Sequence, residues 1–94
     1  MQYNPSIELL ESMHEFPGPF MMKVIGSVED AFVARVVAAV RDELHANVDP
    51  RFRLRYTSGG RHVAITLEPI VKSAEQVLEV YRRIRETRGV ILLL

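Results

Sequence analysis

The residues best suited to chemistry are basic side chains in the second half of the chain. Arginine alternates with other residues over positions 51–55, and Arg61 follows the next turn. Lys23 and His62 are expected on the same surface, which gives a candidate partner-binding set of Lys23, Arg53, Arg55 and His62. Cations gathered on one surface could bind an acidic protein patch or an anionic ligand. Charged residues on an edge strand also prevent sheet-to-sheet aggregation, so both interpretations stay open.

The residue types and their spacing do not indicate a catalytic site or a metal site. The chain has no cysteine, which excludes thiolate nucleophiles, thiolate metal ligands and disulfides. None of His14, His45 and His62 has a second histidine three or four residues away. No nucleophile with its base, and no pair of carboxylates, can be assembled. We predict that the protein is not an enzyme and holds no metal or cofactor.

A glycine before a predicted helix offers one further candidate. Gly26 could expose backbone N–H groups to an anion or a small effector at the helix N-terminus. Glu29 and Asp30 already complement the helix dipole there, which favours a simple tight turn. A small-molecule effector is therefore an open alternative without a specific residue to bind it.

Length and charge limit the classes of function. The 94 residues make one domain, and the 12 basic and 12 acidic residues cancel, so no global positive field favours nucleic acid. The charge is uneven: residues 1–50 hold three basic and eight acidic groups, and residues 51–94 hold nine and four. With no apolar run long enough to cross a membrane and no signal-peptide pattern, we expect a cytoplasmic protein.

The first half of the chain predicts an arm, a strand and a helix. Ile7, Leu10 and Met13 recur at helical spacing in residues 1–15, which the prolines at 17 and 19 separate from a domain over 16–94. Residues 20–25 alternate like a strand that ends at Gly26. A capping-box pattern at 27–30 then predicts a helix over 28–45.

The second half predicts a hairpin, a helix and a strand. Two alternating runs flank Gly59-Gly60, which places Phe52, Leu54 and Tyr56 opposite Leu67, Ile65 and Val63 on one apolar face. Residues 73–76 repeat the capping box before a helix that ends near Thr87, and residues 90–94 form the last strand. The order βαββαβ predicts an α+β, ferredoxin-like two-layer sandwich with an antiparallel sheet in the order 4-1-3-2.

This architecture makes predictions about burial. We expect one core, made of Phe32, Val36, Val40, Val77, Tyr81 and Ile84 from the helices and Val24, Leu54, Val63 and Ile65 from the sheet. The last strand is entirely aliphatic, so its open face needs cover from the N-terminal arm or from a second copy. The candidate self-association residues are Met21, Val90, Ile91, Leu92, Leu93 and Leu94.

Three segments carry a family resemblance. Residues 16–20, 23–26 and 58–66, which include Phe16-Pro17-Gly18-Pro19 and Ser58-Gly59-Gly60, resemble the YbeD-like family of small bacterial proteins of unknown function. The resemblance runs from about Leu9 to Leu94. It implies a ferredoxin-like fold similar to ACT regulatory domains, a non-enzymatic regulatory role and a link to lipoate metabolism, with no catalytic residues to carry over.

The functional prediction is thus a non-catalytic regulatory or interaction domain that binds a protein partner of unknown identity. The alternative is an anion- or nucleic-acid-binding module that uses the basic open face of the sheet. An RNA-binding sheet would need aromatic side chains there, but the expected residues are Met21, Lys23, His62, Ala64 and Thr66.

Overall fold

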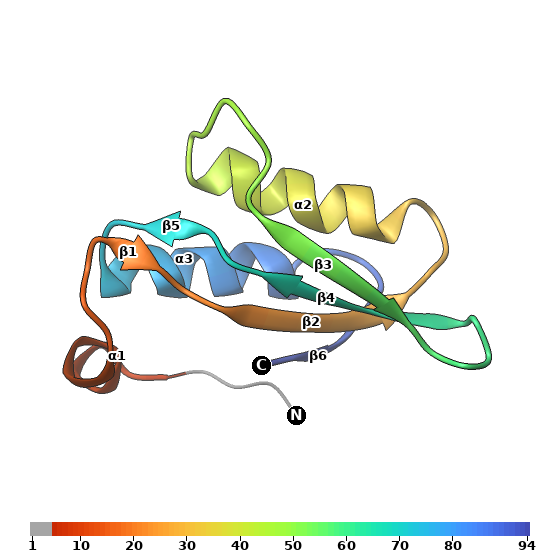
Figure 1. Ribbon diagram of the computed structural model, residues 1–94, viewed down its shortest axis with the longest axis horizontal. Coiled ribbons are helices and arrows are strands. Elements are labelled where there is room, and N and C mark those ends of the chain that lie inside the picture. The colour runs from red at the N-terminus through yellow and green to blue at the C-terminus, as the bar shows by residue number, and fades with distance from the viewer. Residues whose placement is uncertain (1–4) are drawn as a thin grey trace.

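The computed structural model describes residues 5–94 and shows two helices packed on one face of a four-stranded sheet (Figure 1). A short helix precedes this sandwich, and a two-stranded ladder lies beside it. The elements are α1 Ile7–Met13, β1 Gly18–Pro19, β2 Met22–Ser27, α2 Phe32–Glu43, β3 Phe52–Tyr56, β4 His62–Leu67, β5 Ile70–Val71, α3 Ala74–Arg85 and β6 Val90–Leu93.

The sheet topology confirms the predicted fold. Its strand order is β3-β4-β2-β6, and every neighbouring pair is antiparallel. The hairpin has the predicted register, with Tyr56 opposite Val63 and Leu54 opposite Ile65. Gly60 adopts a φ of 72° in the turn, a conformation that glycine tolerates at no steric cost.

The core is the predicted one except at Leu54. Val24, Val63 and Ile65 of the sheet are fully buried beneath α2 and α3, as are the predicted helix residues apart from Tyr81, which is 1% exposed. Leu54 is 40% exposed, so its assignment to the core is wrong. All five residues of β3 are exposed, which shows that the helices cover β6, β2 and β4 and leave β3 outside their edge.

The helix after β2 begins later than predicted. Ser27 pairs with His62 as the last residue of β2, and its Oγ accepts a hydrogen bond from the Glu29 N–H at 3.2 Å. The helix starts at Phe32, after Asp30 and Ala31 take left-handed φ values of 57° and 54°. The capping box at 27–30 is therefore wrong, because Ser27 stays in the sheet, where its N–H donates to the Gly89 carbonyl oxygen at 3.1 Å. The second capping site is confirmed in part: Ser73 caps α3 through the Gln76 N–H at 3.1 Å.

Gly26 does not end its strand, and the packing around it explains why a glycine is needed. A Cβ at this position would lie 2.2 Å from the Phe32 ring and 2.6 Å from the Gly89 carbonyl oxygen. The buried Phe32 ring thus fills the space above Gly26 and Gly89.

Two features at the N-terminal side were not predicted from the sequence in this form. Gly18 and Pro19 of β1 pair with Val71 and Ile70 of β5, and the Phe20 N–H donates to the Pro69 carbonyl at 2.9 Å. Helix α1 packs against α3, and its Leu10 is 2% exposed within the main core.

Candidate functional site

The open face of the sheet brings the four candidate partner-binding residues together. The register places side chains in rows across the strands, on the side away from the helices. One row contains Arg53, Thr66, Lys23 and Leu94, and the next contains Arg55, Ala64, Ile25 and Leu92. His62 lies beyond the second row, opposite Ser27.

These rows divide the open face into two halves of different chemistry. The half over β3 and β4 is basic, with Arg53 and Arg55 exposed at the sheet edge. The half over β6 is aliphatic, with Leu92 and Ile25 half-buried side by side. Within β2, β3, β4 and β6, the open-face positions hold no aspartate or glutamate.

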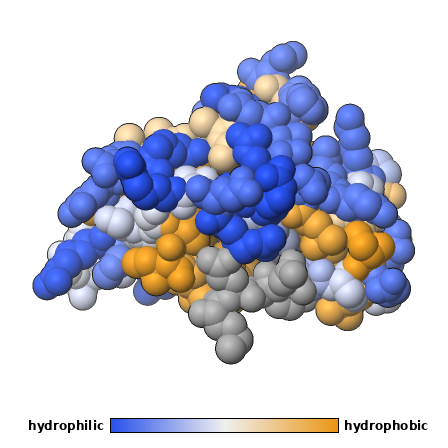
Figure 2. Space-filling view, turned by 180° about the vertical axis from the view of Figure 1, so that it is seen from behind, coloured by the Kyte–Doolittle hydropathy of each residue, from blue (hydrophilic) through white to orange (hydrophobic). Residues whose placement is uncertain are grey.

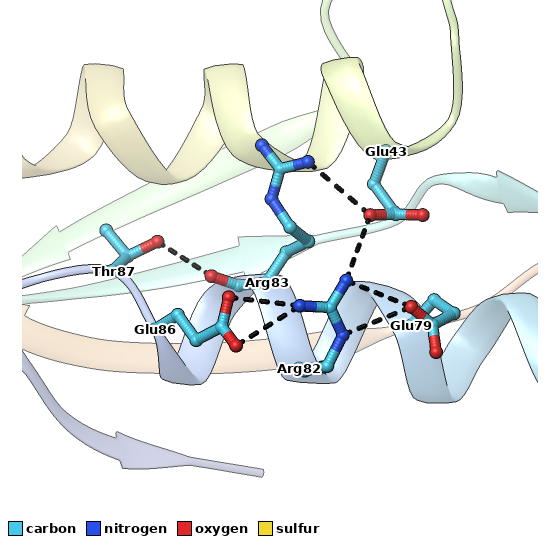
Figure 3. Close-up of polar contacts among 6 residues, drawn as sticks. All are labelled: Glu43, Glu79, Arg82, Arg83, Glu86 and Thr87. Carbon is cyan, nitrogen blue, oxygen red and sulfur yellow. Dashed lines mark hydrogen bonds and ion pairs between the residues drawn. The ribbon is translucent and has the colours of Figure 1, made fainter.

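Arg41, Arg82 and Arg83 of the helical layer form ion pairs, in contrast to the cations of the open face. Arg82 binds Glu79 at 3.0 Å and Glu86 at 3.1 Å on α3, and Arg83 reaches Glu43 at the end of α2 at 3.5 Å (Figure 3). Arg82 donates hydrogen bonds to Glu79 and to Glu86. The bond to Glu79 first, and that to Glu86 second, raises the pKa of the Arg82 guanidinium above its ordinary value.

Near the start of α2, Arg35 and Arg88 also have bonding partners. Arg35 donates to the Asp30 carbonyl oxygen at 2.8 Å and to the Arg88 carbonyl oxygen at 2.7 Å, while the Arg88 side chain pairs with Asp30. No ion pair between residues 5 and 94 involves Lys23, Arg53 or Arg55. The cations of the open face are therefore solvated and available to a ligand.

The candidate self-association residues are exposed to different degrees. Ile91 and Leu94 are 54% and 49% exposed and Met21 is similarly accessible, while Val90 and Leu92 are half-buried. Leu93 faces the helices and is fully buried, so it belongs to the core. Seen from behind, two hydrophobic areas interrupt a mostly hydrophilic surface (Figure 2).

The structure also contains a groove that sequence reasoning missed. It lies between α2 and β3, has a volume of about 550 Å³ and is lined by Val33, Val37, Ala38, Phe52 and Tyr56 among others. Arg41 and Asp49, which pair at 3.0 Å, also line it. The alternating apolar residues of β3 are the available signal, although the sequence prediction places only Leu54 of them in the core.

A second hollow, of about 530 Å³, lies where the segment after α2 meets β1 and β5. Its walls are largely apolar and include Leu44, Val48 and Ile70.

Across residues 5–94, no three histidine, aspartate or glutamate side chains gather as metal ligands. No helix in this part of the chain is long and apolar enough to cross a membrane.

The fold is that of an ACT-like, ferredoxin-type α+β domain. It is similar to the ACT domain from the GTP pyrophosphokinase of Chlorobium tepidum, with a TM-score of 0.59 and 13% identity over 81% of this chain and 96% of that one. The chain belongs to the family described as a protein of unknown function, DUF493, whose model matches residues 11–94.

Relatives in other bacteria agree with this assignment. A UPF0250 protein of Shewanella piezotolerans is 31% identical over 80 residues, covering 85% of this chain and 89% of the relative. The UPF0250 protein RSc0326 of Ralstonia nicotianae is 32% identical over 81 residues, covering 83% and 80%. These matches confirm the resemblance to the YbeD-like family.

Proposed function

We propose that the protein is a non-catalytic regulatory domain that binds a protein partner on the open face of its sheet. The observation that carries this proposal is the set of solvated cations Lys23, Arg53 and Arg55 beside an aliphatic surface. Complementary charge guides association and fixes register, while apolar area supplies affinity. The ACT-like resemblance supports the regulatory part, because it implies a role without catalysis.

The test removes the charge of the face and measures capture of partners. Arg53→Ser combined with Arg55→Ser should weaken capture of proteins from an extract of the source cell, read by mass spectrometry. The matched control, Lys72→Ser with Arg88→Ser, removes two exposed positive charges away from this face. Equal capture by both double variants contradicts the proposal. A connection with lipoate metabolism, implied by the family resemblance, predicts that proteins of that pathway are among those captured.

A second candidate function is binding of an anion or a nucleic acid on the same face. It is favoured by one row of the sheet, in which Arg53 and Lys23 flank the hydroxyl of Thr66. When basic side chains bind the backbone phosphates of a nucleic acid, counterions are released, so the affinity falls steeply as the salt concentration rises. Titration with single-stranded RNA at several salt concentrations would show this dependence, and its loss in the Arg53 and Arg55 double variant would locate the site.

A further inference from the structure

The outer edge of β3 has backbone groups that no neighbouring strand uses. The Thr57 N–H donates to the His62 carbonyl oxygen at 3.0 Å, and the Glu68 N–H donates to the Arg51 carbonyl oxygen at 2.9 Å. Because bonded and non-bonded pairs alternate in an antiparallel ladder, Arg53 and Arg55 direct their backbone groups toward β4. The N–H and C=O groups of Phe52, Leu54 and Tyr56 consequently point away from the sheet. β3 is the last strand of the sheet formed by the described residues.

Two of these residues, Phe52 and Tyr56, line the groove beside α2, and Val33 and Val37 form the opposite wall. Leu54 lies between them on the same side of β3 and is also exposed. A strand added to this edge would direct every second side chain to the helix side of the sheet, alongside the groove. Apolar side chains at those positions would cover the aromatic and aliphatic surface that the helices leave open.

The other face of the added strand would meet the two edge arginines. Arg53 and Arg55 are exposed and belong to none of the ion pairs found within residues 5–94. Opposite charges in neighbouring cross-strand positions stabilise a sheet, and like charges directly opposite destabilise it. Acidic residues are therefore the complementary choice at these positions.

Charge also argues against a second copy as the added strand. Two β3 strands related by a two-fold axis at Leu54 would place Arg53 of each copy opposite Arg55 of the other. The four guanidinium groups would lie together on one face with no carboxylate among the strand positions. A foreign strand with the opposite charge avoids this repulsion.

We propose that the β3 edge binds an extended protein segment in which apolar and acidic residues alternate, as a fifth strand of the sheet. The apolar residues lie along the α2–β3 groove, and the acidic residues lie beside Arg53 and Arg55. This inference rests on the proposed function, because it names the class of partner and how it docks.

The test uses two synthetic peptides of eight residues, one alternating valine with glutamate and the other valine with lysine. Each is titrated into ¹⁵N-labelled protein, and NMR shifts report both affinity and location. The glutamate peptide should bind about tenfold more tightly, since two favourable cross-strand pairs replace two unfavourable ones. Its largest shifts should fall on the backbone amides of Phe52, Leu54 and Tyr56. Equal affinity for the two peptides, or shifts confined to another surface, overturns the proposal.

Two changes separate backbone pairing from charge attraction. Leu54→Pro removes one outward N–H at an edge position, where a sheet tolerates proline, and should abolish binding. A glutamate peptide N-methylated on the residues that bond to β3 removes the reciprocal hydrogen bonds, in which peptide N–H groups donate to β3 carbonyl oxygens. It leaves the protein unaltered, so it serves even if the proline variant does not fold. Binding that survives this methylation overturns strand addition.

Charge reversal gives the specificity test. Arg53→Glu with Arg55→Glu should invert the preference, so that the lysine peptide binds more tightly. Lys72→Glu with Arg88→Glu makes the same change in net charge elsewhere and should leave the preference unchanged. If both double variants invert it, the peptides respond to net charge and the proposal is wrong.

The remaining outcomes distinguish this inference from the proposed function. Light scattering that finds a dimer of the wild-type chain and a monomer of a folded Leu54→Pro variant would assign the edge to a second copy and overturn the inference. Capture from cell extract that is lost with Arg53→Ser and Arg55→Ser but kept with Leu54→Pro would contradict strand addition alone. Capture that is insensitive to the arginine changes would contradict the proposed function.

Discussion

The two edge strands of the sheet differ in what covers them. β6 is aliphatic, and its Leu93 is fully buried against the helical layer. β3 places Leu54 toward the same side of the sheet, yet that side chain is 40% exposed because no helix reaches it. The difference shows that sharing a face with core residues does not make a residue part of the core. One edge is therefore expected to stabilise the domain, and the other is free to bind.

The same substitution at both edges should produce the largest difference. Leu93→Ala removes a fully buried side chain and leaves a cavity, so it should lower the free energy of unfolding by about 2 to 5 kcal/mol. Leu54→Ala should cost about 1 kcal/mol or less, because water already reaches that side chain. Chemical denaturation of both variants measures the two values, and similar losses would mean that β3 is covered after all.

A methyl group added at a glycine tests the same difference between covered and uncovered parts of the sheet. In Gly26→Ala, the new Cβ would meet the buried Phe32 ring and a backbone carbonyl, which should cost about 1 to 3 kcal/mol. In Gly59→Ala, in the β3–β4 turn, the Cβ would meet nothing within 4 Å, so the change should stay under about 0.5 kcal/mol. Thermal melts followed by circular dichroism would detect the difference, and a Gly59 variant as unstable as the Gly26 variant would contradict it.

A further prediction assigns the aliphatic edge to contacts between copies of the chain. Ile91 and Leu94 are about half exposed, and covering the remaining apolar surface of each is worth about 1 kcal/mol. We expect a dimer by light scattering, and Ile91→Ser with Leu94→Ser should shift it to the monomer mass without unfolding it.

Removal of residues 1–14 provides a control for that assignment. The truncation takes Leu10 out of the core and should lower stability, but a dimer formed through β6 should keep its mass. A wild-type chain that is monomeric at high concentration would contradict self-association.

The smallest effect on stability is expected from the edge arginines. Arg53→Ser with Arg55→Ser should change the free energy of unfolding by less than about 0.5 kcal/mol, because both side chains are exposed and make no ion pair among the described residues. Urea melts of wild type and variant measure this. A larger loss would show that the arginines hold β3 in place.

Local patterns in the sequence predicted most of the sheet. The alternation of apolar residues on both sides of Gly59-Gly60 predicts which residues face each other in the hairpin, and this register places Arg53, Arg55 and His62 on one surface. The pairing of β2 with β4 adds Lys23 to the same surface. How far the helices cover the sheet depends on contacts between distant segments. Periodicity in β3 shows that Leu54 shares a face with Phe52, but it does not show where α2 ends its cover.

The errors at Ser27 and in the β1–β5 ladder have the same origin. A serine followed by acidic residues satisfies the local rules for a helix cap. In the structure the Ser27 N–H instead donates to the Gly89 carbonyl and the Val28 N–H to the Arg61 carbonyl, which keeps the segment in the sheet. The ladder between β1 and β5 involves two residues on each side, one of them a proline, and so leaves almost no periodic signal. Contacts between distant segments decide both cases, and a local pattern does not contain them.

The position of β3 at the margin also predicts how this sheet exchanges its amide hydrogens with deuterated solvent. Among the described elements, β3 contacts β4 and little else. The outward amides of Phe52, Leu54 and Tyr56 should exchange at once, and those of Arg53 and Arg55 when β3 detaches from β4. The amides of Val63 and Ile65, which bond toward β2, should exchange only when the whole domain unfolds. One strand pair would thus report surface accessibility, local opening and global stability in a single measurement.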